Sequence, residues 1–329
     1  MEDGEWDFHS YYDKDSEQGD ISYEANSEHT TSYIIVYILT IVISLPGNLC
    51  IVLSVWRKKA LNDAVWYMLA AISLSLAIHN ITTTFYLVYT IEVSWTFGLA
   101  LCRLVPFINM TTIIFTCLSF AAICIIRLLS HSVMKRSFRE HPKYNSAIGL
   151  TIIAIISIVV CIPIAIFHNV ENSGEHKLCI LTSQTLHSHI MWNTLFILSF
   201  AVPFTILWSV NPLMYFYRRK FFSAMSTETF SSNGKSENQM TFLLFMFALS
   251  FTFLLGPLEI LYTLHYFDVA QLTTKAIKVT YSLYSFFPAS IPLIYFASFY
   301  STSSGILFHS TSSGILFRRT SSGILYTSV

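Results

Sequence analysis

Charged residues are scarce in this sequence of 329 residues. Asp, Glu, Lys and Arg together make up 12% of the chain, whereas hydrophobic residues make up 53%. The mean hydropathy is accordingly positive, at +0.56. Because a soluble domain carries roughly 25% charged residues, this composition excludes an ordinary soluble globular protein and indicates a membrane protein.

Catalytic and metal-binding motifs are also missing. The sequence shows no paired carboxylates, metal-ligand cluster, phosphate-binding loop or Ser/His/Asp set, which are the groups that enzyme active sites use. We therefore predict a protein that is not an enzyme, requires no cofactor or metal and has no nucleic-acid partner. A transporter or channel is the alternative from a different class. The lack of inverted repeats and of charged chains across the membrane disfavours it.

Long hydrophobic segments, by contrast, are frequent. A membrane-spanning helix needs about 20 predominantly apolar residues. Seven segments meet this requirement, at 33–56, 64–90, 102–130, 145–168, 190–216, 240–266 and 274–299. The sequence therefore predicts an all-α membrane protein, a seven-transmembrane helix bundle that occupies residues 33–300 within the lipid bilayer.

The few charged residues are distributed unevenly between the two ends of this bundle. With these spans, 14 of the 19 Lys and Arg residues fall on one side, and 15 of the 19 Asp and Glu residues fall on the other. Positive charge collects on the cytoplasmic side of membrane proteins. We therefore expect a multi-pass plasma-membrane protein with its N-terminus outside, its C-terminus in the cytoplasm and a strongly negative outer face.

Neither terminal segment has the composition of a folded domain. Residues 1–32 hold ten acidic residues and one Lys, so we expect a disordered extracellular segment. Residues 301–329 repeat TSSGILF or TSSGILY with a period of nine, which is typical of a disordered cytoplasmic tail. Phosphorylation of the repeats would create an acidic segment able to bind a basic partner, and the last three residues fit a PDZ-domain ligand. The candidate tail residues are Thr302, Ser303, Ser304, Thr311, Ser312, Ser313, Thr320, Ser321, Ser322, Thr327 and Val329.

A single arginine, Arg127, lies near the end of the third apolar segment, in the sequence CIIRLLSHS. It follows Cys102 by 25 residues, which is roughly 37 Å of helix at about 1.5 Å per residue. Because this length slightly exceeds the hydrocarbon thickness, Cys102 is expected at the outer surface and Arg127 at the cytoplasmic mouth of the bundle. The alternative is a snorkelling arginine that only marks the membrane edge.

Two of the six cysteines lie on the predicted outer side, Cys102 and Cys179, and the other four lie within spans. The extracellular compartment is oxidising, so we predict a Cys102–Cys179 disulfide that attaches the second outer loop to the third helix. Two free thiols are the alternative.

Ordered motifs along the spans resemble those of rhodopsin-like (class A) G-protein-coupled receptors. These motifs are Gly47–Asn48, the cysteine pair with Arg127, three prolines in the fourth to sixth spans, and Pro292-Leu-Ile-Tyr295; the prolines are Pro163, Pro203 and Pro257. The resemblance covers about residues 33–300. It implies a receptor that couples to a heterotrimeric G protein through an activation switch at Ile126, Arg127, Leu128 and Tyr295.

A finer resemblance is to chemokine receptors. The segment from Trp95 to Cys102 is similar to their first outer loop, and Tyr11, Tyr12 and Tyr23 lie among acids, as in their acidic N-termini. Chemokines are mostly basic, so a negative outer face would attract and steer them; a merely solubilising tail is the alternative. Glu259, a carboxylate inside the sixth span, is the candidate anchor for a basic ligand terminus.

Several positions depart from the family pattern. Ile126 replaces the acid before the arginine and Leu128 the aromatic after it; Ser73 replaces an aspartate, Leu255 a tryptophan and Ile291 an asparagine, beside the retained Asn48. These losses are similar to those of gammaherpesvirus-encoded chemokine-receptor homologues, for which the location would be the host cell membrane. A divergent host orphan receptor is the alternative origin.

The departures remove polar contacts that hold such receptors inactive. The resemblance therefore implies high basal signalling, because each lost contact shifts the inactive–active balance by about 1–3 kcal/mol. Glu237, at the cytoplasmic end of the sixth span, is a candidate remaining partner of Arg127, and a solvated loop glutamate is its alternative role. A scavenging or decoy receptor that binds chemokine without activating G proteins remains the same-fold alternative.

Overall fold

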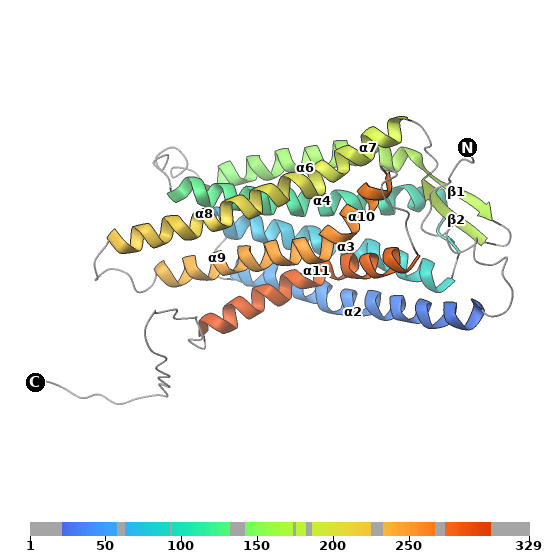
Figure 1. Cartoon of the computed structure of the whole chain (residues 1–329), viewed down its shortest axis with the longest axis horizontal. Helices are drawn as coiled ribbons and strands as arrows, with labels where there is room; N and C mark the ends of the chain where they lie inside the picture. The colour runs from blue at the N-terminus through green and yellow to red at the C-terminus, as the bar shows by residue number, and fades with distance from the viewer. Residues whose placement is uncertain are drawn as a thin grey trace, which may run out of the picture.

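Figure 1 shows the computed structural model of the chain, an elongated bundle of helices that run roughly side by side. The structure describes residues 22–57, 63–92, 94–131, 142–173, 176–181, 186–224, 233–266 and 274–303. All statements below concern these ranges.

Each predicted span corresponds to a helix or to a nearly continuous helical rod. The first four are α2 (Ser22–Arg57), α3 (Ala64–Glu92), α4 (Gly98–His131) and α6 (Pro142–Phe167). The fifth consists of α7 (Leu186–Phe196), the π-turn η3 (Ile197–Ala201) and α8 (Val202–Ala224). The sixth consists of α9 (Asn233–Ser250), the π-turn η4 (Phe251–Leu255) and α10 (Gly256–Tyr266), and the seventh is α11 (Thr274–Ser303).

Six of these rods are long and apolar enough to cross a membrane among the described residues, and α11 contains the seventh predicted segment. The expectation of an all-α seven-transmembrane bundle is therefore confirmed. The boundaries differ in detail. The first helix begins at Ser22, eleven residues before the expected start of its span, and the last continues to Ser303. Hydropathy detects the apolar part of a helix and misses polar turns that continue it into water.

A short β-hairpin lies in the second outer loop and was not predicted. Strands β1 (His168–Ser173) and β2 (His176–Leu181) pair antiparallel, with Val170 opposite Cys179. The hairpin lies at the same end of the bundle as the start of α2, and the last turns of α11 lie at the opposite end (Figure 1). The hairpin therefore lies at the predicted outer face of the bundle.

Stacked aromatic rings lie at the centre of the bundle, and large apolar side chains also cover its outside. Phe120 of α4 stacks on Phe247 of α9 with ring centroids 3.4 Å apart, and Phe251 and Phe287 are fully buried beside them. The exposed large residues of α6 are isoleucines, valine and tyrosine, as expected where a helix faces lipid tails. The two surfaces therefore have the roles that a bilayer requires.

Candidate functional site

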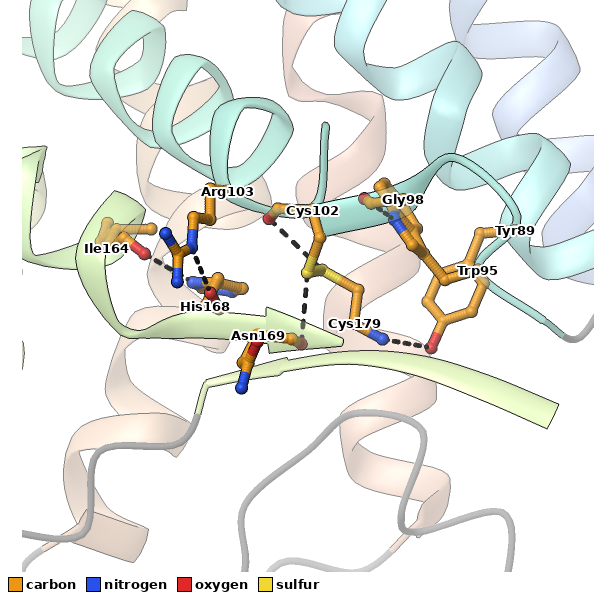
Figure 2. The surroundings of a disulfide bond; sticks show 9 residues. All are labelled: Tyr89, Trp95, Gly98, Cys102, Arg103, Ile164, His168, Asn169 and Cys179. Atoms are coloured by element: carbon orange, nitrogen blue, oxygen red, sulfur yellow. Dashed lines mark hydrogen bonds between the residues drawn. A yellow bond between two sulfur atoms is a disulfide. The ribbon is translucent and has the colours of Figure 1, made fainter. Parts of the chain in front are cut away.

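The outer end of the third helix is joined to the hairpin by a disulfide (Figure 2). Cys102 and Cys179 are bonded, with their Cα atoms 5.5 Å apart, so the predicted pairing is confirmed. The Tyr89 hydroxyl accepts a hydrogen bond from the backbone N–H of Cys179 at 3.4 Å. The hairpin is thereby held over the bundle from both α3 and α4.

Trp95 stabilises the first outer loop from the inside. It is only 1% exposed, packs edge-on against Tyr89 and Phe97, and donates its indole N–H to the carbonyl of Gly98 at 2.9 Å. Its backbone N–H also reaches the carbonyl of Lys177 at 2.6 Å. The ring is enclosed by the loop that it holds, and the role of Trp95 as a ligand contact stays a prediction.

His168 connects the end of α6 to the hairpin (Figure 2). Its Nδ1 donates to the carbonyl of Ile164 at 2.8 Å, while its own carbonyl accepts from the Nε of Arg103 at 3.1 Å. Burial lowers the pKa of His168 below its usual 6.5, and the hydrogen bond to Ile164 opposes this shift only in part. The imidazole is therefore neutral at physiological pH.

Glu259 lies in the outer half of the bundle, where the fifth and sixth rods face each other. The Ser199 hydroxyl donates to its carboxylate at 3.1 Å. Ser199 belongs to η3, and Glu259 follows η4 within the first turn of α10. A π-turn re-aims the side chains beyond it and occurs frequently at functional sites, so the two turns bring this hydroxyl and this carboxylate together. The half-buried carboxylate retains acceptor capacity for a cationic group.

Tyrosines of other helices lie in the same half of the bundle. Tyr37 of α2 and Tyr284 of α11 are buried, and the rings of Tyr281 and Tyr284 lie with their centroids 5.8 Å apart. The outer half of the bundle therefore combines one carboxylate with several phenol groups, a combination suited to an amine and to hydrogen-bonding groups near it.

A buried amide cluster links α2, α3 and α11 deeper in the bundle. Asn48 donates to the Ser44 hydroxyl at 2.9 Å and to the carbonyl of Pro288 at 3.3 Å. Asn80 donates to the same Ser44 hydroxyl at 2.6 Å. Asn48 therefore links α2 to α11, and Asn80 links α3 to α2 through the Ser44 hydroxyl.

The other three positions of the altered core are buried. Leu255 and Ile291 lie in the hydrophobic cluster at the centre of the bundle. Ser73 is fully buried, and its hydroxyl has no hydrogen-bond partner in the part of the chain that the structure describes. The core at this depth contains hydroxyl, amide and aliphatic groups. Position 73 contributes a serine hydroxyl and no carboxylate.

Arg127 is more enclosed than the spacing argument suggested. It lies in the last turns of α4 and is 6% exposed, while Ile126 and Leu128 pack half-buried against the central cluster. Arg127 thus lies near the cytoplasmic end of α4, as expected, but is enclosed there, and its role in G-protein coupling stays a prediction. Glu237 falls within α9, but its side chain lies outside the described residues, so its contact with Arg127 stays a prediction.

Tyr295, at the end of the Pro-Leu-Ile-Tyr sequence, is 3% exposed. Its ring meets that of Trp66 of α3 edge-on, with centroids 6.4 Å apart. Trp66 was not singled out from the sequence. Phe296 packs at right angles to Tyr295 from the next position.

The remaining predicted residues lie in parts of the chain that the structure does not describe. Tyr11 and Tyr12 precede the described residues, and Tyr23 lies in α2 without a described side chain. Of the tail candidates, Thr302 and Ser303 end α11, and the others lie beyond it. Their roles stay predictions.

Polar contacts between helices were missed throughout. His79 of α3 lies 3.2 Å from the Thr112 hydroxyl of α4, and Asn109 donates to Thr82 at 3.2 Å. A sequence pattern identifies that such residues are inside a span. It does not give the rotation of each helix, which decides whether His79 meets Thr112.

Comparison with known proteins places this arrangement in a family. A model described as "7 transmembrane receptor (rhodopsin family)" matches residues 47–295. Apelin receptor A of Danio rerio is 28% identical over 179 residues, which cover 51% of this chain and 47% of that receptor. Endothelin receptor type B of Oryctolagus cuniculus is 27% identical over 152 residues, covering 45% and 34%, respectively.

A third relative is 5-hydroxytryptamine receptor 2B of Dichotomyctere fluviatilis, 23% identical over 184 residues that cover 52% of this chain and 38% of that receptor. The chain thus matches about half or less of the length of these relatives. The family match itself extends over most of the chain and over every rod of the bundle, and the family is one of receptors, not of enzymes. The chain therefore belongs to the rhodopsin family of seven-transmembrane receptors.

Proposed function

We propose that this protein is a plasma-membrane receptor for a basic peptide or small protein and that it activates heterotrimeric G proteins. The observation that carries the proposal is the half-buried Glu259 carboxylate, which accepts from Ser199 in the outer half of a receptor bundle. An intramembrane carboxylate that faces other helices usually has a functional partner. A ligand ammonium or guanidinium is the partner that its charge requires.

The class of ligand follows from charge and from relatives. The outer side holds 15 of the 19 acidic residues against five basic ones, a field that attracts basic ligands and accelerates their association. Two relatives are receptors named for apelin and endothelin, which supports a peptide. More specifically, we propose that the ligand is a chemokine. The basis is the resemblance of the Trp95–Cys102 segment and of the tyrosines in the acidic N-terminus to those of chemokine receptors.

We further propose high basal signalling and a viral type of receptor. Support comes from Ile126, which offers Arg127 no neighbouring carboxylate, and from Ser73, which gives no charge to hold a cation. Each lost restraint of about 1–3 kcal/mol changes the active fraction several-fold or more. If the origin is viral, the location is the host cell membrane. Arrestin and a PDZ protein are the proposed partners of the tail.

A non-signalling scavenger is the second candidate. It is favoured by the altered Ile126–Arg127–Leu128 sequence. The substitutions that remove the acidic neighbour of the arginine also change the surface that a G protein would contact. The two candidates share the ligand site and differ only at the cytoplasmic end.

The test is the binding of radiolabelled chemokines and of basic peptides to membranes that contain the full chain. Glu259→Gln should weaken binding by about 30-fold or more, because losing one partner of a buried ionic pair costs about 2 kcal/mol or more. Glu92→Gln is the matched control, since it removes an exposed carboxylate from the end of α3. Equal effects of the two substitutions, or no binding by any basic ligand, would contradict the proposed site.

A further inference from the structure

A hydrogen bond joins the fifth and sixth rods on the cytoplasmic side of the contact between Ser199 and Glu259. Trp208 of α8 donates its indole N–H to the Thr252 hydroxyl of η4 at 2.9 Å. The Thr252 hydroxyl in turn donates to the carbonyl of Ala248 at 2.8 Å. The fifth rod therefore has a polar contact with the π-turn η4 of the sixth rod.

Trp208 ends a row of aromatic residues along the fifth rod. The others are Phe196, Phe200 and Phe204, which precede it at intervals of four residues. Neighbouring rings in this row have centroids 5.7, 5.3 and 6.3 Å apart. The indole of Trp208 is thus packed against its own rod, and its N–H is available as a donor to the sixth rod.

The same row packs against the two residues that close the π-turn. The backbone N–H of Gly256 donates to the carbonyl of Phe251, which is the i→i+5 bond of a π-helix. The ring of Phe200 stacks on that of Phe251 with centroids 5.4 Å apart, and an added Cβ on Gly256 would lie 3.3 Å from its Cε2. Phe200 therefore contacts both ends of this bond, and Trp208 bonds to Thr252 between them.

The π-turn determines the direction of Glu259. A π-turn adds one residue to a helical turn, and one residue corresponds to about 100° of rotation in an α-helix. If η4 relaxed to a regular α-helix, the side chains of α10 would turn by about that angle relative to α9. Glu259 lies in the first turn of α10. Its carboxylate would then no longer face the Ser199 hydroxyl, which now donates to it at 3.1 Å.

We propose that Trp208 is a positioning residue of the ligand site, which stabilises η4 through Thr252 and thereby directs the Glu259 carboxylate toward the ligand. This inference rests on the proposed function, because it takes Glu259 as the group that binds a ligand cation. Loss of the indole N–H removes one restraint on the π-turn. The population in which Glu259 is misdirected then increases, and affinity for the ligand falls.

The influence of Trp208 on the distant carboxylate is tested by thermal unfolding of the purified full chain, without ligand. The variants are Trp208→Phe, Ser199→Ala and the combination of both. Distant sites that share no partner give additive losses. Here the double variant should lose less than the sum of the two single losses, because Trp208→Phe already weakens the bond from Ser199 to Glu259.

The matched control for this experiment is Trp56→Phe, which removes an exposed indole from α2. Its loss should add in full to that of Ser199→Ala. Full additivity with Trp208→Phe as well would overturn the inference, because it means that Trp208 does not act on the Ser199–Glu259 contact.

The effect on the ligand site is tested by the affinity of membranes that carry the full chain for a radiolabelled basic chemokine. Trp208→Phe and Thr252→Val should each weaken binding by about twofold to tenfold, the ratio expected from loss of one hydrogen bond. Thr252→Ser retains the hydroxyl and should bind like the unaltered protein. In a Glu259→Gln background, Trp208→Phe should have no further effect, because the carboxylate that it positions is absent.

The outcomes separate this inference from the proposed function. Binding that Trp208→Phe leaves unchanged, or weakens equally with and without the Glu259 carboxylate, overturns the inference and leaves the receptor proposal intact. Absence of binding to the unaltered protein overturns the proposed ligand and, with it, the role of Trp208 at the ligand site. Weaker binding in Trp208→Phe and Thr252→Val, with retention in Thr252→Ser and no further loss in the Glu259→Gln background, supports both.

Discussion

Gly47 is a residue whose lack of a side chain has a direct structural reason. An added Cβ would lie 2.5 Å from the Cβ and 2.8 Å from the Cγ of Pro292. A proline ring cannot rotate away as a flexible side chain does, so α2 and α11 would have to separate. The close approach of α2 and α11 at this point therefore depends on Gly47.

We therefore expect Gly47→Ala to destabilise the protein by about 1–3 kcal/mol, the usual cost of overpacking. Gly149→Ala is the matched control, because a Cβ there would meet nothing within 4 Å. The control should be neutral or stabilising, since alanine favours a helix over glycine by about 1 kcal/mol. Thermal unfolding of both purified variants checks this, and similar changes in the two would contradict the packing argument.

His168 gives the outer hairpin a dependence on pH. Its pKa in the folded protein is lowered by burial below the usual 6.5. The unfolded segment therefore binds a proton first as the pH falls, so the stability that the neutral imidazole contributes is present above pH 6.5. That stability is lost progressively as the pH falls from 6.5 through the lower pKa of the folded form.

Amide hydrogen exchange in residues 168–173, expressed relative to the intrinsic exchange rate at each pH, should therefore accelerate as the pH falls from 7 to 5.5. His168→Gln should remove this additional acceleration. His176→Gln, which alters an exposed histidine of the same hairpin, should retain it. Persistence of the acceleration in His168→Gln would assign the pH effect to another group.

The β-hairpin is the element that depends most on a covalent bond. The disulfide closes a separation of 77 residues between α4 and β2, and loss of a native disulfide typically costs about 2–5 kcal/mol. The hairpin is also held by hydrogen bonds to Tyr89, Ser94, Trp95 and Arg103. Without the covalent bond, such noncovalent contacts would have to fix its position over the bundle.

The double substitution Cys102→Ser with Cys179→Ser should therefore increase amide exchange in residues 168–181 and lower the unfolding temperature. Cys50→Ser changes an exposed free cysteine within α2 and should have neither effect. Unchanged exchange in the double variant would show that hydrogen bonds and packing alone hold the hairpin.

The elements could be predicted from the sequence to the extent that hydropathy encodes them. The apolar runs located every span, yet the polar residues 22–32 concealed the outer turns of α2. The hairpin was missed because HNVENSGEHKLCIL lacks a clear alternation of polar and apolar residues. The π-turns η3 and η4 were also missed, since they depend on packing between the rods and have no pattern of their own.

The candidate site was predicted in part for the same reason. Cys102, Cys179 and Glu259 were identifiable because a cysteine outside or a carboxylate inside a span is unusual. Ser199 was not, since a serine within a span has no such distinction until the fold places it 3.1 Å from the carboxylate. The enclosed position of Trp95 was not predicted, because the sequence does not distinguish an aromatic residue that binds a ligand from one that supports a loop.

The two ends of the molecule differ in their charge and in the sites that they carry. The acidic outer side, the hairpin and Glu259 lie toward one end, and Arg127 and Tyr295 lie in the last turns of their helices toward the other. The Phe120, Phe247 and Phe251 packing and the amide cluster of Asn48 connect the two ends. A ligand that displaces Ser199 from Glu259 would act on the sixth rod directly beside this packing.

The decisive measurement is basal nucleotide exchange on G protein, in membranes that carry the full chain and no ligand. Exchange should lie well above that of membranes without the protein, the excess should be lost in Arg127→Ala, and Glu237→Gln should raise exchange further if this glutamate restrains the arginine. Exchange at background in the unaltered protein, or an excess that survives Arg127→Ala, would contradict a receptor whose basal signalling passes through Arg127.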